Sequence, residues 1–205
     1  MMDQDFMTTL QDLLQQEHVF DEDFDALLFP QFQNHSNWHY TEIYVAKLAL
    51  EFLIQGEHTH ILDIGSGVGK FCTVGALLYP NPFTGIEYRK DQVDIARQIA
   101  SQFDWNRVNY LHDNILNQSF NVYDAIYLFN PFLEHKDQTA KMDNQIDISP
   151  SDYTRYKNHV HFQLDQKPIG TRLVSYYCEK AQIPSSYQLK QSKLGATLQF
   201  WEKVH

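Results

Sequence analysis

Apolar residues follow two different rhythms along the chain, and the rhythm changes near His60. Before it, residues 5–29 and 41–53 carry apolar side chains at helical spacing, while residues 30–38 are polar and indicate a loop. After it, short apolar runs alternate with helical periodicity and with a long polar loop over 134–148. The pattern predicts helices over 70–79, 90–103 and 151–166, and strands over 61–64, 83–87, 108–112, 125–129, 173–177, 187–191 and 196–203.

Strands that alternate with helices predict an α/β fold with a parallel sheet and right-handed crossovers. The last two strands follow each other directly around Gly195, so they must be antiparallel and the sheet should end in a hairpin. We expect an N-terminal helical lid or extension over residues 1–55, which packs on the sheet or covers its carboxyl edge, followed by one α/β domain over 56–205.

The composition narrows the class of protein. With 205 residues and 43% hydrophobic side chains, the chain can bury the core of one ordinary domain. The formal net charge of -10 gives no general attraction to nucleic acid or anionic lipid without a local basic patch. Two cysteines, Cys72 and Cys178, exclude a disulfide framework. No apolar run reaches the ~20 residues of a membrane span, so we expect a cytoplasmic protein.

The strongest motif is a glycine-rich turn after the first predicted strand, Asp63-Ile64-Gly65-Ser66-Gly67-Val68-Gly69. Glycines there let the backbone approach a ligand closely, and the next helix begins with free N–H groups. A phosphate-binding P-loop is excluded, because Ile64 replaces its first glycine and Phe71 replaces its serine or threonine. The dinucleotide fingerprint is weakened by Lys70 in place of its third glycine.

Polar residues also follow the next three predicted strands. Glu87 lies 22 residues after Gly65, at a distance typical of a carboxylate that accepts hydrogen bonds from both ribose hydroxyls. Asp113-Asn114 follows the third strand and Asn130-Pro131-Phe132 the fourth. Because ligands bind at the carboxyl ends of parallel strands, these residues are expected to lie at one edge of the sheet. Asp, Asn and Pro are also common turn residues, which is the structural alternative for the last two motifs.

An acidic residue followed by Gly-x-Gly-x-Gly, as in Asp63 to Gly69, makes residues 40–178 resemble the seven-stranded S-adenosylmethionine-dependent methyltransferases. The resemblance implies a Rossmann-like, doubly wound, mostly parallel seven-stranded sheet, with S-adenosyl-L-methionine as the cofactor of the domain over 56–205. It places the three glycines around the methionine part, Glu87 on the ribose, Tyr88 against the adenine and Asp113 on the adenine amine. The expected cofactor-binding residues are Tyr40, Glu42, Asp63, Gly65, Ser66, Gly67, Gly69, Glu87, Tyr88, Asp113, Asn114, Ile115 and Asn130.

Two further resemblances are narrower: the first concerns the cofactor motifs only, and the second concerns the acceptor. Tyr40-Thr41-Glu42 is similar to the Tyr-Gly-Glu element of Dot-type lysine methyltransferases, although Asn130-Pro131-Phe132 departs from their Asn-Asn-Phe. The latter motif resembles the Asn-Pro-Pro-Tyr element of N-methyltransferases without its second proline. There the asparagine and the proline carbonyl accept hydrogens from the target nitrogen. We therefore expect Asn130, Pro131 and Phe132 to be catalytic, with a nitrogen or oxygen of a protein or small molecule as the acceptor.

Three functions stay open at this point. The first is the methyltransferase, the second a cofactor-binding but non-catalytic module that acts as a partner or regulator, and the third an NAD-dependent oxidoreductase. The histidine pairs His58/His60 and His159/His161 lack the setting of a metal-ligand motif, so no metal site is expected. His135, just beyond Phe132, is a candidate for the substrate pocket. The acidic run over 21–25 predicts a solvated face.

Overall fold

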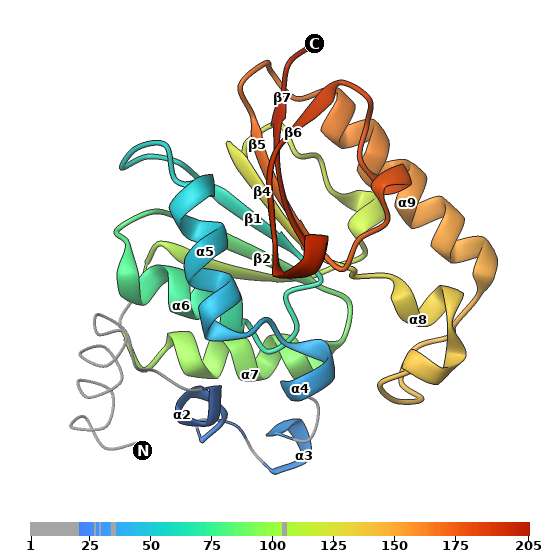
Figure 1. The fold of residues 1–205 in the computed structure, drawn as a ribbon. Helices are drawn as coiled ribbons and strands as arrows, with labels where there is room; N and C mark the ends of the chain where they lie inside the picture. The colour runs from blue at the N-terminus through green and yellow to red at the C-terminus, as the bar shows by residue number, and fades with distance from the viewer. Residues whose placement is uncertain (1–20, 27, 29, 34–35, 104–105) are drawn as a thin grey trace.

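The computed structural model describes residues 21–26, 28, 30–33, 36–103 and 106–205, so the periodicity expected over residues 5–20 lies outside the described part. The strands form one sheet (Figure 1): β1 (Ile61–Ile64), β2 (Phe83–Glu87), β3 (Val108–His112), β4 (Ala125–Phe129), β5 (Arg172–Tyr176), β6 (Tyr187–Lys193) and β7 (Leu198–Lys203). The α-helices of the described residues are α2 (Asp21–Asp25), α3 (Pro30–Gln33), α4 (Ser36–His39), α5 (Ile43–Leu53), α6 (Lys70–Leu78), α7 (Lys90–Ala100), α8 (Leu133–Lys136) and α9 (Pro150–Asp165).

The strand order is β3-β2-β1-β4-β5-β7-β6. Strands β1 to β5 are parallel, and β7 is antiparallel to both β5 and β6, which confirms the predicted parallel sheet and its terminal hairpin. Successive strands progress outward from β1 through β2 to β3, and then β4 pairs with the opposite side of β1. The direction of winding therefore reverses between β1 and β4, and such a reversal opens a ligand-binding crevice at the carboxyl ends of the two strands.

Helices cover both faces of the sheet (Figure 1). Helices α5, α6 and α7 bury their apolar residues in one core cluster on one face, and α9 packs Val160 and Leu164 against the other face. Within α5, Ala49, Leu50 and Leu53 are fully buried, and this helix contacts β4, β5 and β7. The helix expected just before residue 56 therefore packs on the sheet, which was one of the two expected arrangements.

Two segments expected to be loops contain short helices instead. Residues 30–38 include α3 and the start of α4, and residues 134–148 include most of α8 and a 3₁₀ turn, Gln138–Ala140. Single turns leave too little periodicity to be recognised in a sequence, and buried side chains such as Phe32 and His135 fix them through contacts elsewhere. None of the described helices has the length and apolar character needed to cross a membrane. The cytoplasmic location stays a prediction.

Candidate functional site

The glycine-rich turn connects β1 to α6 and has the backbone conformation that its sequence predicts. Gly65, Gly67 and Gly69 have φ values of 75°, 54° and 79°, in the left-handed region that favours glycine. A Cβ atom at Gly65 would lie 2.7 Å from Cβ of Pro131, at the end of β4. A Cβ at Gly67 would lie 3.0 Å from Oε1 of Gln92. The absence of side chains therefore lets the ends of β1, β4 and α7 approach each other closely.

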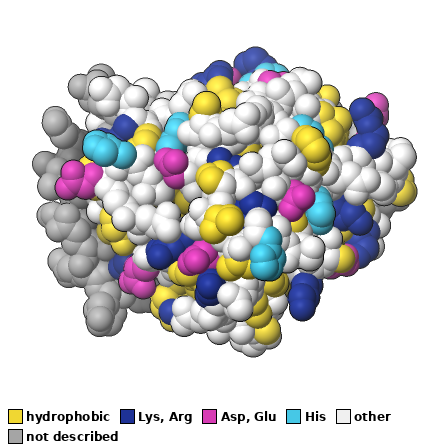
Figure 2. Space-filling model, turned by 90° about the horizontal axis from the view of Figure 1, so that it is seen from above, with side chains coloured by type: hydrophobic (Ala, Val, Ile, Leu, Met, Phe, Trp, Pro, Cys, Tyr) yellow, Lys and Arg dark blue, Asp and Glu magenta, His cyan; other side chains and the backbone are white. Residues whose placement is uncertain are grey.

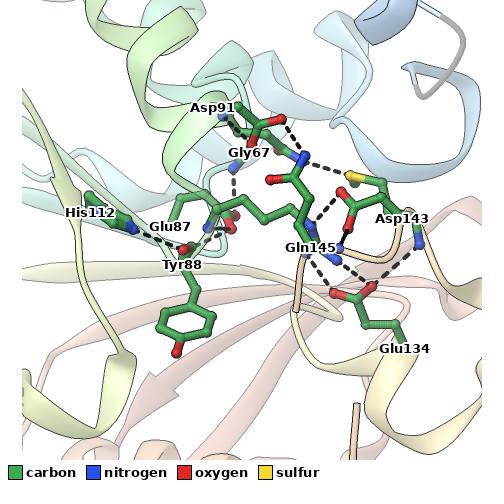
Figure 3. A network of polar contacts seen from close by, with 11 residues as sticks. Gly67, Glu87, Tyr88, Asp91, His112, Glu134, Asp143 and Gln145 are labelled. Atoms are coloured by element: carbon green, nitrogen blue, oxygen red, sulfur yellow. Dashed lines mark hydrogen bonds and ion pairs between the residues drawn. The ribbon is translucent and has the colours of Figure 1, made fainter. Parts of the chain in front are cut away.

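The carboxylate of Glu87 is fixed beside this turn (Figure 3). The backbone N–H groups of Tyr88 and Arg89 both donate to its Oε1 at 2.8 Å, and that of Gly67 donates to Oε2 at 3.2 Å. Glu87 is 9% exposed, and burial raises its pKa, although the three N–H groups and the charge of Arg89 oppose the rise. A carboxylate held by rigid backbone donors is preorganised to accept further hydrogen bonds from a ligand.

Two cavities meet at Glu87. The large cavity, of about 510 Å³, lies in front of Gly67 and Asn130, and the small cavity, of about 70 Å³, lies in front of Tyr88 and Asn114. The predicted site residues in the wall of the large cavity are Tyr40, Glu42, Gly65, Gly67, Glu87, Asn130 and Pro131. Those in the wall of the small cavity are Gly65, Glu87, Tyr88, Asp113, Asn114, Ile115, Pro131 and Phe132.

Three predicted cofactor residues, Asp63, Ser66 and Gly69, line neither of these cavities. Asp63 is buried on β1, where the thiol of Cys72 donates to its Oδ2 at 3.7 Å. Burial raises the pKa of Asp63 to about 8, opposed by that thiol and reinforced by the charge of Glu87. At neutral pH this carboxyl group therefore holds a proton in the folded chain.

Asp113 lies at the small cavity but already accepts hydrogen bonds from its own turn. Its donors are Nδ2 of Asn117 at 2.7 Å, Nε2 of Gln118 at 2.5 Å and the backbone N–H of Asn114 at 2.7 Å. The bond from Asn117 contributes most to lowering the pKa of Asp113. An ionised carboxylate has about four acceptor positions, so one remains for a ligand. The turn-forming and ligand-binding interpretations of Asp113 are therefore compatible.

The residues after β4 form the boundary between the two cavities. Asn130 has a φ of 36°, an uncommon value for a residue other than glycine, and its backbone N–H donates to Sγ of Cys178 at 3.3 Å. The ring of Phe132 packs at 5.2 Å from that of Tyr156 on α9. His135 lines the small cavity, where its Nδ1 accepts from the backbone N–H of Ser149 at 3.2 Å. The strained backbone of Asn130 is of a kind that is common at functional sites.

A buried ion-pair network that the sequence did not indicate joins α7 to the segment after β4 (Figure 3). Two guanidinium nitrogens of Arg89 donate to the two carboxylate oxygens of Glu134 at 2.7 Å each, and Nε donates to Asp143 at 2.9 Å. Burial alone would lower the pKa of Arg89, but the two carboxylates raise it overall. Nε2 of Gln145 also donates to Asp91 at 2.8 Å. This network holds the segment 134–145, in which Glu134 lines both cavities and Thr139, Ala140 and Met142 line the large one.

Several buried polar atoms around the large cavity have no hydrogen-bond partner among the described residues. They include the hydroxyl of Tyr40, Oε2 of Glu42 and Oε1 of Gln92. Buried polar atoms without partners are rare in folded proteins, and a bound ligand is one way to satisfy them. The ring of Tyr40 and the amide of Gln92 both lie beside Gly67, so the turn that carries the glycine motif adjoins unfilled hydrogen-bonding capacity.

The arrangement suits an organic ligand. No group of three or more His, Cys, Asp or Glu side chains in the described ranges has the geometry to hold a metal ion. The crevice instead offers a carboxylate at β2, close-approaching glycines at β1, and apolar and aromatic walls on either side. These features fit a nucleoside with a polar extension, with a sugar at Glu87 and a flat base in the direction of Tyr88 and Ile115.

Comparison with known proteins agrees with this geometry. Residues 55–202 match a family model described as a methyltransferase domain, and no curated protein sequence matches the chain. Among solved structures, TrmN from Thermus thermophilus is similar at 17% identity and a TM-score of 0.59, over 80% of this chain and 49% of that one. An RNA methyltransferase from Salinibacter ruber, in complex with S-adenosyl-L-homocysteine, gives 20% identity and a TM-score of 0.55, over 78% and 90%.

A third similar structure is the N-methyltransferase NodS from Bradyrhizobium japonicum WM9, at 14% identity and a TM-score of 0.53, over 86% of this chain and 98% of that one. At these identities the structures show a shared fold, and the chain spans about half the length of TrmN. The narrower similarity to Dot-type lysine methyltransferases is not supported by these matches and stays a prediction. With 148 of its 205 residues covered by the family model (202 − 55 + 1), the chain belongs to the methyltransferase-domain family and has the Rossmann-like fold of S-adenosylmethionine-dependent methyltransferases.

Proposed function

We propose that the protein binds S-adenosyl-L-methionine in the crevice between β1, β2 and β4 and transfers its methyl group to a nitrogen or oxygen acceptor. The single observation that carries this proposal is the fixed carboxylate of Glu87 at the junction of the two cavities, next to the glycine turn. Gly65 and Gly67 would adjoin the methionine part, and Glu87 would accept from the ribose hydroxyls. Tyr88, Asp113, Asn114 and Ile115 would surround the adenine.

The cofactor's methionine part carries an ammonium group and a carboxylate, and the chain offers matching polar atoms. The unpartnered Oε1 of Gln92 and the hydroxyl of Tyr40 lie on the side of the large cavity nearest Gly67. S-adenosyl-L-methionine supplies a methyl group activated as part of a sulfonium, so the protein mainly has to bind and orient the two reactants. We assign that orientation to Asn130, Pro131 and Phe132, which separate the two cavities.

For the acceptor we propose a protein or small molecule. The formal net charge of -10 works against a polyanion, and Figure 2 shows acidic, basic and histidine side chains intermixed on the face that it displays. Of the structurally similar proteins, the one from Salinibacter ruber is called an RNA methyltransferase. Their identities of 20% or less carry the fold and not the acceptor.

Calorimetric titration with S-adenosyl-L-homocysteine and, separately, with NAD tests the cofactor. We expect the first compound to bind with a micromolar dissociation constant and NAD to show no saturable binding. If only NAD binds, the proposed methyltransferase function is wrong and the oxidoreductase function takes its place.

Turnover separates the enzyme from a non-catalytic module. Asn130→Ala should lower methyl transfer by about 100-fold, a factor typical of a lost positioning group, while affinity for S-adenosyl-L-homocysteine changes by less than about threefold. Equal losses in both measurements would place Asn130 in cofactor binding and not in the transfer step.

A further inference from the structure

One carboxylate in the large cavity lies beyond the part assigned to the cofactor. Glu42 occupies the N-cap position of α5 without a side-chain cap hydrogen bond. This helix end is tied to β4 because Oγ1 of Thr41 hydrogen-bonds the hydroxyl of Tyr127 at 3.0 Å. The hydroxyl of Tyr176, the last residue of β5, donates to Oε1 of Glu42 at 3.1 Å. Glu42 is therefore anchored at the β5 end of the cavity.

The sheet order separates this carboxylate from the cofactor. Strand β5 is two strands from β1 in the order β1-β4-β5, which corresponds to about 10 Å at the usual strand spacing. The methionine part, beside Gly67 on the β1 turn, already has Tyr40 and Gln92 within reach. Asn130 at the end of β4 lies between the two positions. Glu42 thus lies on the β5 side of the large cavity, beyond the place proposed for the methionine part.

The surroundings of Glu42 favour a positive charge. Its Oε2 atom is buried and has no hydrogen-bond partner within the described ranges. Next to it, the rings of Phe129, Tyr176 and Tyr177 form a cluster with centroid separations of 4.6–6.2 Å, and Phe129 and Tyr177 line the cavity. A carboxylate together with aromatic faces is the combination that binds alkylammonium groups, through charge-assisted hydrogen bonds and cation–π attraction.

Of the arginine and lysine side chains in the described residues, Arg89 is the one that lines the large cavity, and its charge is already engaged. Its guanidinium group holds Glu134 and Asp143 at 2.7–2.9 Å. A neutral alcohol in the cavity would leave the charge of Glu42 uncompensated, whereas an ammonium group would both neutralise it and donate to the open Oε2 atom.

We infer that the methyl acceptor is a primary alkyl amine, on a small molecule or a side chain, and that Glu42 binds its ammonium group before transfer. The bound group would lose one proton to water, and the freed nitrogen lone pair would form the bond to the methyl carbon. The carbon–sulfur bond would break with its electrons on sulfur, which leaves S-adenosyl-L-homocysteine. This inference rests on the proposed methyltransferase function and changes the expectation for Glu42 from cofactor binding to acceptor binding. Tyr177, which lines the same cavity, has a φ of 51°, an uncommon value for a residue other than glycine, and its side chain is 55% exposed. Strained backbone of this kind is common at binding sites.

Ligand-observed NMR on the complex with S-adenosyl-L-homocysteine tests the inference, with n-hexylamine and its uncharged analogue n-hexanol as probes. We expect hexylamine to bind at least tenfold more tightly than hexanol to the wild-type complex. Glu42→Gln, which keeps the shape of the side chain, should reduce this preference to less than threefold. Glu51→Gln removes an exposed carboxylate from the same helix and should leave the preference unchanged.

The outcomes separate this inference from the proposed function. Equal affinities of the two probes for the wild-type complex would refute amine recognition without any variant. A Glu42→Gln protein that still prefers hexylamine tenfold would remove Glu42 from the acceptor site. A tenfold loss of affinity for S-adenosyl-L-homocysteine in Glu42→Gln would show that Glu42 binds the cofactor, as the sequence first suggested, and would refute its role in acceptor binding. Failure of the wild-type protein to bind S-adenosyl-L-homocysteine at all would overturn the proposed function and this inference together.

Discussion

The buried carboxyl group of Asp63 should make the stability of the protein depend on pH in a direction opposite to that of most acidic residues. Its pKa is raised from 3.8 to about 8 in the folded chain, chiefly by burial. Between these two values the folded state holds a proton that the unfolded state has lost. Stability is therefore greatest below the unfolded value and falls as pH rises, by about 1.4 kcal/mol per pH unit for one proton. From about pH 5 to about pH 7 the loss amounts to about 3 kcal/mol.

Chemical denaturation of the wild-type protein and of Asp63→Asn, at several pH values in this range, measures the effect. The difference in the free energy of unfolding between the two proteins should shrink by about 3 kcal/mol as pH rises from about 5 to about 7, because asparagine does not titrate. Asp113→Asn is a matched control: the pKa of Asp113 is lowered from 3.8, so its contribution changes only at lower pH. Parallel stability curves for wild type and Asp63→Asn would show that Asp63 is ionised in the folded protein and would refute the reasoning.

Three other variants test the elements that hold the site. Gly69→Ala would place a Cβ 2.5 Å from a buried tyrosine hydroxyl, at a φ of 79°, and should lower the free energy of unfolding by more than about 2 kcal/mol. Gly195→Ala is the control, because it has a similar φ of 65° but open space around it, and it should lower the free energy of unfolding by only about 1 kcal/mol. Equal costs would contradict the close packing of the turn. Lys70→Met should lower the free energy of unfolding by about 2 kcal/mol, because the charge-assisted hydrogen bonds to Asp21 and Asp25 are lost. An unchanged denaturation midpoint would mean that Lys70 does not hold α2 in place. Arg89→Leu should lower the free energy of unfolding by about 3 kcal/mol, because Glu134 and Asp143 lose their partner. The double variant with Glu134→Leu should recover the part of this loss that is due to the more deeply buried Glu134. A double variant no more stable than Arg89→Leu would contradict the coupling of the two residues.

Local patterns were sufficient to predict the sheet and the glycine turn. Strands β2, β3 and β4 have the predicted bounds, because each is a short apolar run closed by a polar residue or turn. The turn after β1 has the positive φ values that its three glycines predict. The convergence of Glu87 and Asn130 on one crevice also followed from the sequence, since parallel strands deliver their carboxyl ends to one edge.

Pairings between distant charged residues could not be predicted in the same way. The acidic run over 21–25 was expected to be solvated, but Asp21 and Asp25 bind the ammonium group of Lys70, which is 2% exposed. Arg89 and Glu134 are 45 residues apart and pair across the cavities. Neither pairing leaves a periodic signal in the sequence, because each depends on where two separate segments meet in the folded chain.

A crystal structure with S-adenosyl-L-homocysteine tests the central claim most directly. The account predicts electron density for the nucleoside across the junction of the two cavities, with both ribose hydroxyls within hydrogen-bond distance of the Glu87 carboxylate and the methionine part beside Gly67. Density for the compound at another place, or a ribose that makes no contact with Glu87, would contradict it.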